Sequence, residues 1–138
     1  MREIKFRAWD GDKKEMSSEI RLDFAHGLRL ISTTDLGFDM SSDDKCVLMQ
    51  FTGLLDKNGK EIYEGDIVKY TRINGKEIIA EIEWRSEDGC YYYFNHKEPV
   101  DSDVSNKEST FFIATTITEI IGNIYENPEL LTDRKSVV

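Results

Sequence analysis

The sequence predicts a mainly β protein, and three observations support this fold class. Apolar and polar residues alternate over several short segments with the two-residue period of a half-buried strand. Asn-Gly and Asp-Gly pairs, which accept the backbone of tight turns, separate these segments at residues 58–59, 74–75 and 88–89. The length of 138 residues and the 39% share of hydrophobic residues suit one compact folding unit. We therefore expect consecutive strand hairpins around one core.

Residues 1–45 are predicted to form an N-terminal β region with a polar acidic loop. A first strand is expected over residues 3–9, where Ile4, Phe6 and Ala8 alternate with Lys5, Arg7 and Trp9. Alternation over residues 20–24, followed by further apolar residues at 28–31, predicts a second strand pair. Residues 32–45 turn polar and acidic, which predicts a loop between the two parts of the chain.

The strongest local signal is the pair Asn74-Gly75 between two strand-like segments, residues 67–73 and 76–84. A two-residue loop would pair Val68 with Glu81 and mix apolar with acidic side chains on one face. A three-residue loop with Gly75 in the left-handed conformation shifts the register by one residue and separates the two kinds. We prefer this bulged register, which directs six side chains inward: Val68, Tyr70, Ile78, Ala80, Ile82 and Trp84.

The rest of residues 46–138 continues the series of strands and turns. Strands are expected over residues 46–52 and 90–94, and turns at Asp56–Gly59 and Glu64–Asp66. Residues 96–109 are polar and aperiodic, which predicts a long surface loop. Residues 111–125, interrupted at Gly122-Asn123, predict one bent strand or two short ones that close the sheet. Asn127-Pro128-Glu129 then predicts a short helical turn with Asn127 as its cap.

Charge and cysteine content narrow the function classes. The 27 acidic and 18 basic residues give a net charge of −9, which disfavours nucleic acid unless the basic residues gather on one face. Cys46 and Cys90 form no C-x-x-C pair and are expected to be buried apolar residues. The chain also shows no secretory start pattern and no apolar stretch long enough to cross a bilayer. We expect the reducing cytoplasm of the cell and no membrane partner.

No catalytic, cofactor-binding or metal-binding residue is predicted. The segment that begins at Asp56 lacks the glycine and glutamate that a calcium loop needs, and Gly53–Lys60 has the wrong spacing for a phosphate-binding loop. His26 and His96 share no ligand spacing with the cysteines. Glu61, Glu64 and Asp66 could supply an acid and base pair, but solvated turn carboxylates are the favoured interpretation.

One segment combines basic and aromatic residues and is the main candidate for an interaction surface: Arg2, Lys5, Arg7 and Trp9. Proteins that bind single-stranded nucleic acid use such residues for backbone contacts and base stacking. The competing interpretation is a strand with a buried aromatic face and solvated cations, which we favour. Tyr91-Tyr92-Tyr93-Phe94 offers further aromatic surface, about half of which a strand would bury.

Three motifs together resemble the YopX family of phage and prophage proteins. They are REIKFRAWD at residues 2–10, MQFTGL and YEGDIV within residues 49–68, and IGNIYENPELL at residues 121–131. The resemblance implies a phage or prophage source and a partly open SH3-like small barrel over residues 46–138, packed with the N-terminal region. It implies no activity. Within the motifs, Gly53, Gly65 and Gly122 suit tight backbone, and Gln50, Thr52 and Asn123 are expected to bond turn backbone.

The leading functional hypothesis is a non-enzymatic phage accessory protein that acts as an interaction module, with an unidentified protein partner or a second copy of itself. Two other hypotheses stay open within binding. A small barrel can present aromatic residues to nucleic acid, here through Arg2–Trp9. Alternatively, the negative charge could imitate DNA and inhibit a host enzyme. An enzyme whose site assembles only on folding is the third class.

Overall fold

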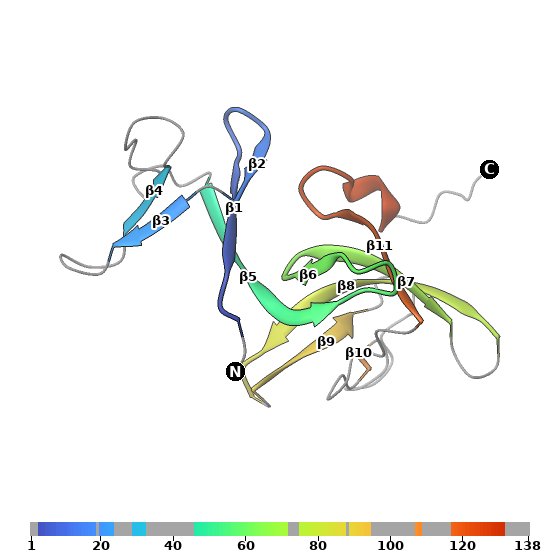
Figure 1. Ribbon diagram of the computed structural model, residues 1–138. Helices are drawn as coiled ribbons and strands as arrows, with labels where there is room; N and C mark the ends of the chain where they lie inside the picture. Colours follow the sequence, from blue (N-terminus) through green and yellow to red (C-terminus); the bar gives the residue numbers. More distant parts are fainter. Residues whose placement is uncertain are drawn as a thin grey trace. The chain divides into compact units, whose positions relative to one another are not determined.

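Mainly β structure is confirmed. The computed structural model describes residues 3–18, 20–23, 29–32, 46–71, 75–87, 89–94, 107–108 and 117–131. In these ranges the regular elements are strands, apart from one short 3-10 helix near the C-terminus (Figure 1). The chain divides into two compact units, Met1–Phe51 and Thr52–Val138. The predicted division into residues 1–45 and 46–138, as parts of one compact folding unit, stays a prediction.

The first unit contains an antiparallel sheet and a separate hairpin. In the sheet, β1 (Phe6–Asp10) pairs with β2 (Glu15–Ser17) and with the first half of β5 (Cys46–Leu55). The hairpin joins β3 (Ile20–Asp23) to β4 (Arg29–Ser32), which confirms the second strand pair expected from the sequence. Ser32, the first residue of the loop predicted over residues 32–45, belongs to β4, and the rest of that loop lies outside the described residues.

The small core of the first unit centres on Ala8, which is fully buried. Half-buried side chains of β3 and β5 pack against it: Ile20, Leu22, Cys46 and Leu48. Ile4, which the alternation placed with Ala8, is instead 67% exposed because β1 begins only at Phe6. Asp10 fixes the turn that follows β1, since its Oδ1 accepts the N–H groups of Asp12 (3.0 Å) and Lys13 (3.2 Å).

The second unit is built on a five-stranded antiparallel sheet in the order β10-β9-β8-β7-β11. The strands of this sheet are β7 (Asp66–Thr71), β8 (Glu77–Arg85), β9 (Cys90–Phe94), β10 (Lys107–Glu108) and β11 (Thr118–Asn123). The second half of β5 lies beside β6 (Glu61–Tyr63), in a sheet ordered β2-β1-β5-β6. The 3-10 helix spans Pro128–Leu130.

The hairpin register expected around Gly75 is confirmed. Val68 pairs with Ala80 and Tyr70 with Ile78, one residue away from the two-residue-loop alternative, and Gly75 has a φ of +87°. Five of the six side chains predicted to face inward are buried. Trp84 is the exception at 47% exposed, because β7 pairs with β8 only as far as Ile67 and Glu81, so Trp84 extends beyond the covered part of the sheet.

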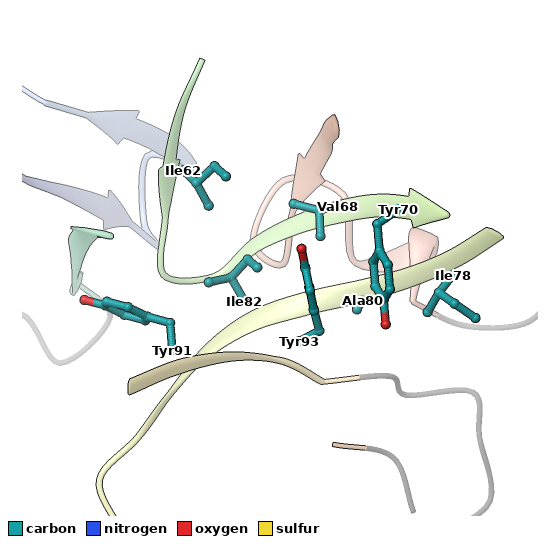
Figure 2. Packing of buried hydrophobic residues seen from close by; sticks show 8 residues of the cluster. All are labelled: Ile62, Val68, Tyr70, Ile78, Ala80, Ile82, Tyr91 and Tyr93. Atoms are coloured by element: carbon teal, nitrogen blue, oxygen red, sulfur yellow. The ribbon is translucent and has the colours of Figure 1, made fainter. Parts of the chain in front are cut away.

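The core of the second unit lies on one face of this sheet and under β6 (Figure 2). It consists of Ile62, Val68, Tyr70, Ile78, Ala80, Ile82, Tyr91 and Tyr93. The rings of Tyr70 and Tyr93 stack with their centroids 4.1 Å apart and their planes at 20°. The small side chain of Ala80 lies between Ile78 and Ile82 on the same strand face, which leaves room for the two rings.

The bent strand, one of the two alternatives expected within residues 111–125, is found from residue 117 onward as β11 with a bulge between Ile120 and Gly122. Two other predictions near the C-terminal end need correction. The surface loop predicted over residues 96–109 includes β10, which pairs with β9 at Phe94 and Tyr93. The 3-10 helix is present, but Asn127 does not cap it, because its side chain points back to accept the N–H of Asn123 (3.2 Å).

Candidate functional site

Buried polar side chains of the second unit gather at its turns and at the ends of its strands. They are Thr52, Asp56, Asp66, Thr118 and Asn123, and all except Thr118 belong to, or closely follow, the motifs singled out in the sequence. A buried polar group is costly unless it is hydrogen-bonded, so the partners of these side chains show what they do. Their hydrogen bonds therefore decide whether any of these side chains is available for catalysis or ligand binding.

Asp56 connects two segments that are 64 residues apart. Its Oδ1 accepts the N–H groups of Asn58 (2.8 Å) and Lys60 (2.9 Å), and its Oδ2 accepts the N–H of Ile120 on β11 (3.0 Å). Next to it, the N–H of Lys57 donates to the carbonyl of Thr118 (2.9 Å). The turn between β5 and β6 therefore covers the outer edge of β11, and Asp56 holds it there.

The ionisation of Asp56 follows from these contacts. Burial raises the pKa of the Asp56 carboxyl, but the three N–H donors and the charge of Lys60 lower it further than burial raises it. The net result is a pKa below the ordinary value for aspartate. Asp56 is therefore an ionised hydrogen-bond acceptor at neutral pH, which suits a structural role and not that of a proton donor.

Of the three carboxylates considered as an acid and base pair, Glu61, Glu64 and Asp66, one is not solvated as the sequence suggested. Asp66 is only 2% exposed, and its Oδ2 accepts the N–H of Tyr63 (2.8 Å) across the turn that contains Gly65. Glu61 accepts the Tyr63 hydroxyl (3.2 Å). The interpretation of Asp66 as a solvated carboxylate is thus wrong, since the turn buries it against the backbone.

Gly122, Asn123 and Asn127 fix the turn that follows β11. Oδ1 of Asn123 accepts the N–H groups of Tyr125 (3.0 Å) and Glu126 (2.8 Å), while its Nδ2 donates to Glu126 Oε1 (2.7 Å). A Cβ at Gly122 would lie 2.6 Å from Asn127 Oδ1, so only glycine fits there without movement. Close backbone at this position, and turn bonding by Asn123, were both predicted and are confirmed.

Thr52 has the same kind of role at the start of the second unit. Its hydroxyl donates to the carbonyl of Ile62 on β6 (2.8 Å) and accepts the N–H of Leu54 (3.2 Å). Gly53 between them has a φ of +91° and Gly65 a φ of +84°, the left-handed conformation expected of tight backbone. The N–H of Ile124 donates to the carbonyl of Gly65 (2.9 Å), which joins two of the motifs directly.

The basic segment of the first unit is only partly available for binding. Arg2 lies outside the described residues. Lys5 forms an ion pair with Glu3 (3.4 Å) and lies 5.7 Å from the ring centroid of Phe51. Arg7 is half-buried, and Trp9 is 9% exposed. Alternation along β1 places Arg7 and Trp9 on one face, but the indole is buried, so it is not presented for base stacking.

The hydroxyl groups of two tyrosines on β9, Tyr92 and Tyr93, are used in hydrogen bonds to other side chains. The hydroxyl of Tyr92 donates to Glu83 (2.6 Å), and burial together with this carboxylate raises the pKa of the Tyr92 phenol. The Tyr93 and Thr118 hydroxyls are 2.7 Å apart in the core. Among the described residues, no three His, Cys, Asp or Glu side chains come close enough to hold a metal ion.

Four large apolar side chains of the described residues are exposed: Ile4, Leu55, Trp84 and Ile117. Three of them belong to the second unit. Sequence reasoning missed Trp84 because alternation alone assigned it to the core face. The signal that could have found it is the unequal length of the two strands of the hairpin, since β8 continues beyond the turn at Gly65 where β7 begins.

These features define a small β protein whose buried polar residues fix its turns and which, in the described part of the chain, exposes few large apolar side chains. The chain belongs to the YopX family: the sequence model described as YopX protein matches residues 5–132. Within the part of the chain that the structure describes, no helix is both long enough and apolar enough to cross a membrane.

Individual relatives agree with this assignment. The chain is 27% identical over 136 residues to the SPbeta prophage-derived uncharacterized protein YopX of Bacillus subtilis, covering 91% of this chain and 94% of that protein. It is similar to the crystal structure of YopX from Bacillus subtilis, with a TM-score of 0.62, 26% identity and coverage of 98% and 100%. It is also similar to that of EF1440 from Enterococcus faecalis, with a TM-score of 0.61, 29% identity and coverage of 96% and 100%.

Proposed function

We propose that this protein is a phage- or prophage-encoded accessory protein that acts in the host cytoplasm as a non-enzymatic interaction module. The observation that carries the proposal is the division of roles within the second unit. Its buried polar side chains are used in turns and strand edges, whereas large apolar side chains, Trp84 foremost, are left on the surface. Tryptophan is one of the residue types that contribute most to protein interfaces, and Trp84 is 47% exposed.

The polar residues of the motifs support binding over catalysis. A catalytic carboxylate must reach a substrate, yet Asp56 accepts three backbone N–H groups and Asp66 faces the Tyr63 N–H. Thr52 and Asn123 likewise bond the backbone. A family can share such residues because they are needed for folding, while its members present different surfaces to different partners.

Affinity capture from cells that carry the phage or prophage tests this proposal. The tagged full-length chain, cross-linked before lysis, should retain a protein partner in amounts comparable to its own, and the purified partner should bind the chain in calorimetry. A tagged chain of similar size and charge is the control. If cross-linked capture recovers only this chain, and sedimentation shows that it is a monomer, the interaction module as proposed is wrong.

The two alternatives within binding have less support. Nucleic-acid binding through Arg2, Lys5, Arg7 and Trp9 would have to work with a buried Trp9 and with Lys5 paired to Glu3. Salt-dependent binding of single-stranded oligonucleotides, lost in Lys5→Ala/Arg7→Ala, would favour it over our proposal. Imitation of DNA would require inhibition of a host nucleic-acid enzyme that disappears when acidic residues are neutralised.

A further inference from the structure

Trp84 occupies an unusual place for an indole. It belongs to the face of β8 that carries Ile78, Ala80 and Ile82, the core face, but it is 47% exposed. Pairing between β7 and β8 ends at Ile67 and Glu81, so on the β7 side no strand of this sheet lies opposite Trp84. The side chains on this face of β8 are therefore buried as far as Ile82 and become exposed at Trp84.

Tyr91 holds one side of the indole. The two residues are direct cross-strand partners, their ring centroids are 4.9 Å apart, and their planes meet at 68°. Tyr91 itself is 9% exposed and belongs to the core cluster (Figure 2). An edge-to-face contact with a buried ring restricts Trp84 before any partner arrives, which lowers the entropy cost of using it as a binding anchor.

The charge of the second unit indicates what kind of partner would approach. Residues 52–138 contain 17 acidic and 10 basic residues, a net charge of −7, so this unit carries most of the net charge of −9. The cation next to Trp84 in sequence, Arg85, alternates to the opposite face of β8, with its guanidinium carbon 5.9 Å from the ring centroid of Tyr92. An exposed indole attracts lysine and arginine side chains through its π-face, and the net negative charge of the unit favours basic over acidic partners at longer range.

We propose that Trp84, supported by Tyr91, is the anchor for a basic polypeptide, with a lysine or arginine side chain of the partner placed on the indole. This inference rests on the proposed function and specifies the chemistry of the partner. Apolar contact with the ring supplies affinity, and the acidic unit speeds the encounter and disfavours acidic partners.

The test uses the full-length chain and a labelled lysine-rich peptide, with its fully acetylated form as the uncharged control, in fluorescence anisotropy. The wild type should bind the lysine peptide and not the acetylated one. Trp84→Ala should weaken binding about tenfold, within the range expected for loss of a cation–π contact. Leu55→Ala, which shortens another exposed apolar side chain, is the matched control and should bind like the wild type. Trp84→Phe, which keeps an aromatic ring, should bind the peptide with intermediate affinity. This graded loss would show that the weaker binding of Trp84→Ala follows the aromatic ring and not a loss of folding.

Several results would overturn the proposal. If Trp84→Ala binds the lysine peptide as well as the wild type does, charge alone attracts the peptide and the indole is not the anchor. If the acetylated peptide binds as well as the lysine peptide, the partner needs no cation. Loss of a wild-type dimer in Trp84→Ala on sedimentation would show that a second copy covers the indole. Loss of oligonucleotide binding in that variant would assign the indole to nucleic acid. A cellular partner captured equally well by Trp84→Ala would refute this site while leaving the interaction module intact.

Discussion

Replacement of Asp56 by alanine should destabilise the second unit more than any other single carboxylate change at its turns. The substitution removes the acceptor for three backbone N–H groups. Those of Asn58 and Lys60 belong to exposed residues, so water can replace the carboxylate, and each loss costs about 0.5 kcal/mol. The N–H of Ile120 is half-buried and loses a charged acceptor, which costs about 1–3 kcal/mol. The sum is roughly 2–4 kcal/mol.

Urea unfolding of the full-length chain, followed by tyrosine and tryptophan fluorescence, measures this loss. Asp56→Ala should lower the transition midpoint, and Asp56→Asn should lower it less because one carbonyl oxygen remains. Glu87→Gln, in an exposed turn of the same unit, is the control and should change the free energy of unfolding by less than about 0.5 kcal/mol. If Asp56→Ala unfolds at the same urea concentration as the wild type, Asp56 does not hold the turn against β11.

Three further predictions follow from the same contacts. The pKa of Asp56 is lowered in the folded state, so its carboxylate stabilises the fold above the pKa of an unfolded aspartate, and this stabilisation is lost as the pH falls through the folded value. The free energy of unfolding, measured by urea titration at several pH values, should therefore drop below about pH 4, and less steeply in Asp56→Asn. Gly122→Ala forces Asn127 away from the Asn123 N–H and should cost about 1–3 kcal/mol in thermal unfolding, whereas its combination with Asn127→Gly should cost less than the sum, and simple additivity would argue against the clash. Tyr93→Phe removes the bond to the buried Thr118 hydroxyl and should cost about 1–2 kcal/mol, while Tyr93→Phe/Thr118→Val should recover part of it; no recovery would mean that the two hydroxyls are not coupled.

The sequence was most informative where local chemistry decides the structure. The register around Gly75 could be derived because one register mixes Val68 with Glu81 and the other does not, and the observed pairing of Val68 with Ala80 agrees. The turns at Gly59 and Gly65 were predicted from their turn-forming residues, and both glycines have the positive φ that such turns favour. Local patterning specified these elements without knowledge of the rest of the chain.

Features that depend on contacts between distant segments were not predictable. Nothing near Asp56 in the sequence indicates that its carboxylate accepts the N–H of Ile120. The burial of Asp66 depends on a turn that folds back onto Tyr63, and the exposure of Trp84 depends on where β7 ends. For the segment with Lys5, Arg7 and Trp9, the favoured interpretation was a strand with a buried aromatic face, and the burial of Trp9 agrees with it. The half-burial of Arg7 was not expected from the pattern.

The central claim is that the motif residues maintain the fold while Trp84 binds the partner. The affinity of the lysine-rich peptide for folded Asp56→Asn and folded Trp84→Ala, measured side by side below the onset of unfolding, tests it most directly. We predict that Asp56→Asn binds like the wild type although it is less stable, and that Trp84→Ala binds about tenfold more weakly under conditions where both variants are folded. Weaker binding by Asp56→Asn together with unchanged binding by Trp84→Ala would contradict both roles.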